Sequence, residues 1–194
     1  MIKLTSLYEY YSSMAAIPES EWEFVESHFV NYKYSKGDHL IRSGEETEYI
    51  YFIESGLART YFIDKQGTEY NKIFLAENDI ASAYVELLNG TNARINIQAL
   101  EDMNTYAFKY SKVELLYKRH ECWNELGRKI AENFFKVKEQ REYEFLLLDA
   151  QERYEVFKSS YGHLMNRVPQ YHISAYLGIT PVSLSRIVRK IKTS

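Results

Sequence analysis

The sequence predicts an α+β protein in which a β-roll lies between helical segments. Apolar residues recur every three or four positions up to about residue 30 and again after residue 111. Between Tyr32 and Lys109, short runs rich in Tyr, Ile, Phe and Thr alternate with turn sequences. Because helices repeat about every 3.6 residues and strands about every two, this double change of period predicts helical ends and a β-rich centre.

The composition is that of a soluble globular protein. The chain has 194 residues, 45% of them hydrophobic, which allows one or two domains with a buried core. Residues 1–9 lack an apolar run flanked by basic residues, and no stretch approaches the ~20 apolar residues of a membrane span. We therefore expect a cytoplasmic protein without a membrane partner. The lone Cys122 excludes an internal disulfide and a metal site built from cysteines alone.

Residues 4–30 predict two helices. Their apolar stripes are Leu7, Tyr11 and Met14 in the first helix and Trp22, Val25 and Phe29 in the second. Pro18 and the acidic residues after it mark the start of the second helix. Both stripes are expected to pack on the β-rich centre.

Turn sequences divide residues 32–109 into short strands. The turns are Lys36-Gly37-Asp38, Ser43-Gly44, Ser55-Gly56, Lys65-Gln66-Gly67, Glu77-Asn78-Asp79 and Asn89-Gly90-Thr91-Asn92. The clearest strands are residues 49–53 and 57–63. This spacing predicts a β-roll of about eight strands, which forms the first domain together with the helical lead, over residues 1–111.

Residues 112–148 predict a long dimerisation helix. The side chains expected at the dimer interface are Trp123, Leu126, Ile130, Phe134 and Val137, which recur at helical spacing. Such a helix is longer than one small domain can cover, so part of its apolar stripe should meet a second copy of the chain. The alternative is that the helix folds back onto its own β-roll.

Residues 149–194 predict a helix-turn-helix. Apolar residues at Ile173, Leu177, Ile179, Leu184 and Ile187 give each of two short helices one buried face. Gly178 fits the sharp turn because glycine takes positive φ without steric cost. Thr180-Pro181 predicts an N-cap followed by the first residue of a second helix. In a helix-turn-helix, this second helix enters the DNA major groove.

The charge distribution favours DNA as the partner. Residues 156–194 contain six Lys or Arg and no Asp or Glu, so their formal charge is +6 and that of residues 1–155 is −9. A basic unit of this kind suits a polyanion, because neutralising phosphates releases counterions. The alternative is a solvated basic tail.

Several motifs accompany this order of elements. They are residues 168–187, read as Val-Pro-Gln-Tyr-His-Ile-Ser-Ala-Tyr-Leu-Gly-Ile-Thr-Pro-Val-Ser-Leu-Ser-Arg-Ile, with Lys36-Gly37-Asp38, Gly44-Glu45, Tyr51-Phe52-Ile53 before Gly56, and Asn78-Asp79-Ile80. In these features the chain resembles the Crp/Fnr family of bacterial transcription regulators over nearly its whole length.

The resemblance implies a cyclic-nucleotide-binding-like β-roll of the double-stranded β-helix or jelly-roll type, a dimerisation helix and a winged-helix-like DNA-binding domain. It implies a homodimer that places two recognition helices in successive major grooves of a palindromic site, with RNA polymerase as a further candidate partner. Family members usually continue into a β-hairpin wing. Because this chain stops at Ser194, the helix-turn-helix is expected to lack most of the wing.

The family's base-reading positions correspond to Pro181, Val182 and Arg186. Arg186 can form a bidentate bond to guanine, whereas Val182 either contacts a thymine methyl or belongs to the core. The positions that usually touch phosphate are Thr180, Ser183 and Arg189, and Ser185 lies on the same polar circumference. Tyr171 and His172 are further candidates for contacts to the DNA backbone.

The resemblance places an effector site at Ser82, Ala83, Tyr84, Arg94 and Ile95. Cyclic-nucleotide-binding members have a Gly-Glu pair where this chain has Ser82-Ala83, and an Arg-Ser or Arg-Thr pair where it has Arg94-Ile95. Ala83 cannot accept the hydrogen bond of the ribose hydroxyl, so we expect no response to cyclic AMP and no cofactor. Arg94 either binds another anion or forms a structural ion pair. The Fnr-type cysteine cluster is absent.

Enzymatic function is not expected. The five histidines are spread over separate segments, and the sequence contains no nucleophile elbow or phosphate-cradling glycine loop. The expected function is a dimeric, sequence-specific DNA-binding regulator with no metal site. The alternative is a dimeric sensor or adaptor that binds a small molecule or anion and does not read DNA.

Overall fold

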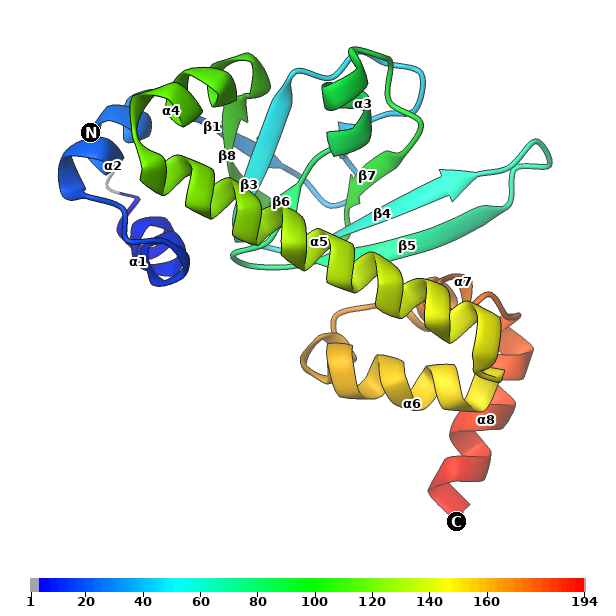
Figure 1. Ribbon diagram of the computed structural model, residues 1–194. Helices are drawn as coiled ribbons and strands as arrows, with labels where there is room; N and C mark the ends of the chain where they lie inside the picture. The colour runs from blue at the N-terminus through cyan, green and yellow to red at the C-terminus, as the bar shows by residue number, and fades with distance from the viewer. Residues whose placement is uncertain (1–3, 194) are drawn as a thin grey trace.

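A computed structural model describes residues 4–193 of the chain. The strands are β1 (Val30–Tyr34), β2 (His39–Ile41), β3 (Tyr49–Ser55), β4 (Ala58–Ile63), β5 (Glu69–Leu75), β6 (Ile80–Ala81), β7 (Asn96–Ala99) and β8 (Met103–Lys109). The α-helices are α1 (Thr5–Met14), α2 (Glu19–Glu26), α3 (Tyr84–Asn89), α4 (Val113–Arg119), α5 (Glu121–Leu147), α6 (Ala150–Tyr161), α7 (Gln170–Leu177) and α8 (Pro181–Thr193). Short 3₁₀ turns lie at Tyr110–Lys112 and Gly162–Leu164. Figure 1 shows the β-roll above and the C-terminal helices below.

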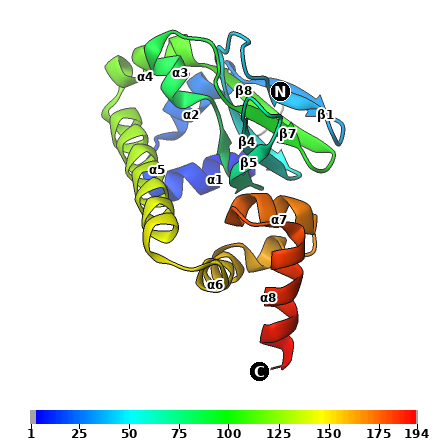
Figure 2. The ribbon, with the colours of Figure 1, turned by 90° about the vertical axis from the view of Figure 1, so that its right-hand side faces the viewer.

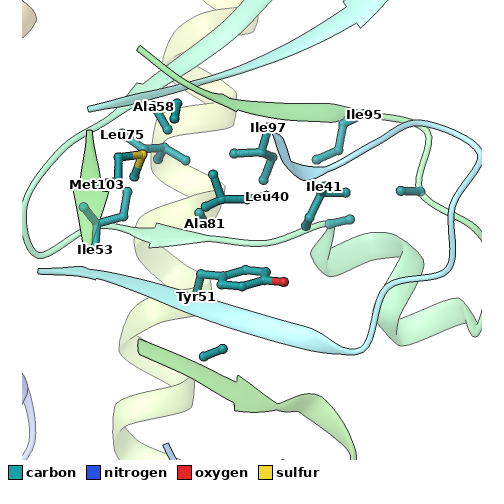
Figure 3. Close-up of a cluster of buried hydrophobic side chains, with 14 residues drawn as sticks. Leu40, Ile41, Tyr51, Ile53, Ala58, Leu75, Ala81, Ile95, Ile97 and Met103 are labelled. Carbon is teal, nitrogen blue, oxygen red and sulfur yellow. The ribbon is translucent and has the colours of Figure 1, made fainter. Parts of the chain in front are cut away.

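The β-roll consists of two antiparallel four-stranded sheets, as the sequence predicts. Their strand orders are β1-β8-β3-β6 and β2-β7-β4-β5. Small and branched apolar side chains fill the space between them, including Ile53, Ala58, Ala81 and Ile97 (Figure 3). Because alternate residues of a strand face opposite sides, each strand also presents a second set of side chains to the outside of the roll.

Gly56 allows a close approach within the roll. It has φ +100°, and a Cβ at this position would lie 2.6 Å from the carbonyl oxygen of Asp102. Any side chain would therefore separate the turn after β3 from the residues that lead into β8.

The N-terminal helices cover the outer face of the sheet that contains β8. Leu7, Tyr11, Trp22 and Val25 pack with Phe108 in one cluster, to which α4 and the first half of α5 also contribute. The expected packing of the helical lead on the β-rich centre is therefore confirmed.

This packing corrects two members of the expected dimer interface. Trp123 is only 4% exposed, and Leu126 is also buried, because both side chains join the cluster of α1 and α2 within the same chain. Ile130 packs against the same cluster and Phe134 is half-buried, whereas Val137 is exposed. For the first half of α5, the alternative interpretation applies, in which the helix folds back onto its own domain.

The predicted helix over residues 112–148 is interrupted. His120 takes extended backbone angles (φ −153°, ψ 144°), and its Nδ1 accepts a hydrogen bond from the amide of Cys122 at 3.1 Å. His120 thus ends α4 and caps the start of α5. The chain turns again after α5, where Leu148 is extended and Asp149 begins α6 with a capping box.

The C-terminal helices pack against the roll through a shared apolar core. Phe74 of β5 contacts Phe157 of α6 and Tyr176 of α7, with ring centroids 6.0 and 5.6 Å apart. Helix α8 projects away from the roll in both views (Figures 1 and 2). No helix within residues 4–193 combines the length and apolar character needed to cross a membrane.

Candidate nucleic-acid interface and effector region

The geometry of α7, the turn and α8 is that of a helix-turn-helix. Gly178 caps α7 with φ +68°. The Oγ1 atom of Thr180 accepts a hydrogen bond from the amide of Ser183 at 3.2 Å, which caps α8 ahead of Pro181. Leu184 is fully buried between the two helices and α6, so it fixes the rotation of α8. The predicted turn and N-cap are therefore confirmed.

The rotation of α8 leaves the predicted DNA-reading side chains on the surface. Those classed as exposed are Thr180, Pro181, Val182, Ser185, Arg186 and Arg189, and Ser183 is half-buried. Val182 is 62% exposed, which excludes the interpretation that it belongs to the core. Arg186 and Val182 are four residues apart, so they lie on one face of the helix near its N-terminal end.

His172 was expected to contact DNA, and the structure contradicts this. Its side chain is 3% exposed because α7 packs on β5. Nη1 of Arg59 lies 3.1 Å from Nδ1 of His172, and the side-chain amide of Asn71 donates to the His172 carbonyl oxygen at 2.8 Å. Burial, together with the Arg59 charge, lowers the pKa of His172 to about 4. His172 therefore serves as a neutral link between the helix-turn-helix and the roll. Its neighbour Tyr171 is exposed.

A second polar link lies just before α7. The guanidinium of Arg167 donates to Glu77 at 2.9 and 3.0 Å and to Glu101 at 2.7 Å. The hydrogen bonds from Arg167 hold the pKa of Glu77 at about 2, well below its ordinary value. Both glutamates belong to loops of the β-roll, so this arginine joins the two parts of the chain.

The five expected effector residues do not share one site. Ala83 and Ile95 are buried in the interior of the roll. Ser82 and Tyr84 face the opposite way, toward a cavity beneath α5. Arg94 points to solvent, and its Nε donates to Glu86 at 2.7 Å. The structural ion pair considered for Arg94 is therefore present.

The comparisons with known proteins agree with the fold. Residues 32–120 match the family described as "Cyclic nucleotide-binding domain". FixK2 from Bradyrhizobium japonicum has a similar structure, with a TM-score of 0.73, 20% identity and 85% of each chain covered. A CooA mutant from Carboxydothermus hydrogenoformans gives a TM-score of 0.70 at 18% identity, with 88% of this chain and 79% of that chain covered.

A third structure carries the family name itself. A protein from Eubacterium rectale, named as a transcriptional regulator of the Crp/Fnr family, matches with a TM-score of 0.72 and 12% identity, covering 92% of this chain and 85% of that chain. This chain has the Crp/Fnr fold. No curated protein matches its sequence.

Within this Crp/Fnr fold, the residues that join the roll to the helix-turn-helix are not among those predicted from the sequence. Arg59 is buried in β4, where it also hydrogen-bonds Gln98 and forms an ion pair with Glu69. A signal for it existed, because Arg59 is the one charged residue in the strand 57–63 and a buried charge requires partners. No signal identified Glu77 and Glu101 as partners of Arg167, since the three residues are far apart in sequence.

Proposed function

We propose that the chain is a sequence-specific DNA-binding transcription regulator that acts as a homodimer. The observation that carries this proposal is the surface of α8. A core residue, Leu184, fixes the rotation of the helix, and this rotation leaves Arg186 and Val182 exposed at the end that would enter a major groove. The absence of acidic residues after residue 155 supports an anionic partner.

The proposed dimer uses the outer face of α5. Phe135 and Leu146 are 62% and 73% exposed, and their separation of eleven residues places them on one side of the helix. This side lies away from Trp123 and Leu126, which pack on the chain's own domain. Exposed side chains of this size at coiled-coil spacing suit a second copy of the same helix.

We further propose that cyclic AMP does not control this regulator. Ala83 offers no side-chain acceptor for a ribose hydroxyl, and Arg94 is already engaged by Glu86 at 2.7 Å. A bound cyclic phosphate would have to compete with that carboxylate.

Selection of random DNA duplexes by the purified protein tests the function, because it would recover a palindromic site. On that site, Arg186→Ala should weaken binding by ~1–3 kcal/mol and relax the preference at one base pair. Arg189→Ala should weaken binding to all sequences alike, as expected for a phosphate contact. Fluorescence anisotropy on the selected site and on three single-base variants measures both effects.

Arg42→Ala is the matched control, because Arg42 is an exposed arginine of the roll rather than of α8. It should leave both affinity and specificity unchanged. Equal losses on specific and random DNA for Arg186→Ala and Arg189→Ala would contradict the assignment of Arg186. Failure to select any sequence at modest salt would contradict the proposed function.

A further inference from the structure

A cavity lies beneath the first half of α5, on the outer side of the sheet that contains β3 and β8. Its volume is about 110 Å³. The walls come from helices α1 to α5 and the sheet, and they include Val25, Phe52, Phe108, Val113 and Ile130. An apolar cavity of about 150 Å³ binds benzene in a protein core, so this somewhat smaller space is on the scale of one small aromatic molecule.

The walls of the cavity are aromatic and uncharged. Phe29 meets Phe52 edge to face and Phe108 at a tilt, with ring centroids 5.3 and 5.5 Å apart, and Tyr11 meets Phe52 edge to face at 5.3 Å. Rings held edge to face in this way favour a further ring placed among them. Among the residues that the structure describes, no acidic or basic side chain lines the space. A charged ligand would therefore lose its hydration without gaining a partner.

The polar side chains that line the cavity are uncharged: they are tyrosines, tryptophans and Ser82. The Tyr11 hydroxyl donates to the Asn78 carbonyl oxygen at 3.2 Å, and Nε1 of Trp123 donates to Glu21 at 3.0 Å. The Ser82 side chain also reaches the wall. These contacts suit an uncharged ring that carries a single donor or acceptor.

The cavity is separate from the interior of the roll. Ala81 and Ala83 face the interior, where a cyclic-nucleotide-binding-like domain would hold its effector, whereas Ser82 and Tyr84 face the cavity. The sheet itself therefore divides the two spaces. Because Trp123, Leu126 and Ile130 of α5 form one wall, a molecule in the cavity would contact the helix whose outer face we assign to the dimer.

We propose that this cavity is a binding site for a small, uncharged aromatic molecule. The site is independent of DNA recognition, since none of its walls belongs to α7 or α8. If the chain binds DNA but no aromatic probe, the proposed function stands and the proposed site is wrong.

Isothermal titration calorimetry of the full chain with indole and with benzoate tests the proposal. Indole should bind with a negative heat-capacity change, which marks burial of apolar surface, and should raise the melting temperature. Benzoate has a similar ring but carries a charge, so it should produce neither effect.

Substitutions that fill the cavity locate the site. Val113→Phe and Ile130→Phe should each weaken indole binding at least tenfold. Leu115→Phe on α4 and Val137→Phe on α5 are the matched controls, because both positions are exposed and lie outside the cavity walls. They should bind indole as the unmodified chain does.

Circular dichroism establishes that each variant is folded, and the comparison of indole with benzoate in the unmodified chain does not depend on any variant. The proposal is overturned if indole gives neither heat nor a melting shift near its solubility limit. It is also overturned if the folded cavity-filling variants bind indole as tightly as their controls, because the probe would then occupy another place.

Discussion

His172 contributes to the contact between the helix-turn-helix and the roll as a neutral side chain, because burial and the Arg59 charge lower its pKa. Its Nδ1 faces the guanidinium of Arg59 at 3.1 Å, so this nitrogen accepts a hydrogen bond and the proton of the neutral ring is on Nε2. Protonation would place a second positive charge beside Arg59 in a buried position. Glu69 accepts a hydrogen bond from the same nitrogen of Arg59 and offsets part of that repulsion.

This arrangement predicts a pH dependence of stability. An unfolded chain protonates His172 below its ordinary pKa of 6.5, whereas the folded chain keeps it neutral down to about 4. The unfolded state therefore binds more protons in this window, and the free energy of unfolding should fall by up to about 3 kcal/mol as the pH drops from 6.5 to 4. Urea denaturation at half-unit pH steps measures this slope.

The control is a comparison of two variants. His172→Gln removes the titrating group and retains an acceptor for Arg59, so its stability should change less over the same window. His163→Gln alters an exposed histidine on the preceding turn. Its unfolding free energy should change with pH as that of the unmodified chain does. An unchanged slope in His172→Gln would show that His172 does not cause the pH dependence.

At the scale of single residues, the sequence predicted what local geometry decides. Gly178 and Thr180 have their roles because a tight turn needs positive φ and a helix start needs an acceptor, and both requirements act within a few positions. His172 was assigned wrongly because its environment comes from Arg59 and Asn71, which lie about a hundred positions earlier. A single sequence contains no record of that contact.

Among the elements, α5 shows where periodicity is ambiguous. A stripe of apolar residues predicts that one face is covered, and Trp123, Leu126 and Ile130 are indeed covered. The period does not identify the partner that covers this face. Here the partner is the chain's own α1 and α2. The exposed Phe135 and Leu146 lie on another side of the helix. The sequence does not single out Phe135 and Leu146, because the apolar stripe of the covered face is enough to produce the helical period.

Arg167 joins the loop between α6 and α7 to Glu77 and Glu101 of the roll. Arg167→Lys keeps the charge but loses the planar fork that contacts Glu77 and Glu101 together. Because these groups are partly exposed, the loss should be about 1 kcal/mol of unfolding free energy. Urea denaturation measures it, and the difference from the unmodified chain should shrink in 1 M salt.

Lys158→Arg serves as the control for Arg167→Lys, since Lys158 is an exposed cation of α6. It should not change stability measurably at either salt concentration. If Arg167→Lys is as stable as the unmodified chain at low salt, the three-way contact does not hold the loop.

For the whole molecule, the proposed dimer makes a prediction about assembly. Phe135→Asp combined with Leu146→Asp should raise the dimer dissociation constant at least tenfold, because each carboxylate would lose its hydration in an apolar interface. Sedimentation velocity over a range of protein concentrations measures the change. DNA affinity should fall with it, since a palindromic site is read by two subunits.

Val30→Asp is the control for this pair. Val30 is also an exposed apolar residue, and its strand β1 lies across the molecule from α5 (Figure 2). Its assembly should match that of the unmodified chain. A monomer at all concentrations in the unmodified protein would contradict the homodimer.

The joint between α5 and α6 determines what kind of movement this architecture permits. Leu148 is extended, and Asp149 accepts from the amides of Gln151 and Glu152 while the Glu152 carboxylate accepts from the amide of Asp149. Helix α6 therefore completes its first turn with its own side chains and needs no help from α5. Reorienting the C-terminal helices would break no backbone hydrogen bond within α5 or within α6. Its angle to the roll is set by side-chain contacts, which are the apolar core around Phe74 and Phe157 and the hydrogen bonds of Arg59 and Arg167. Small shifts in those contacts would alter the spacing of the two recognition helices in the proposed dimer.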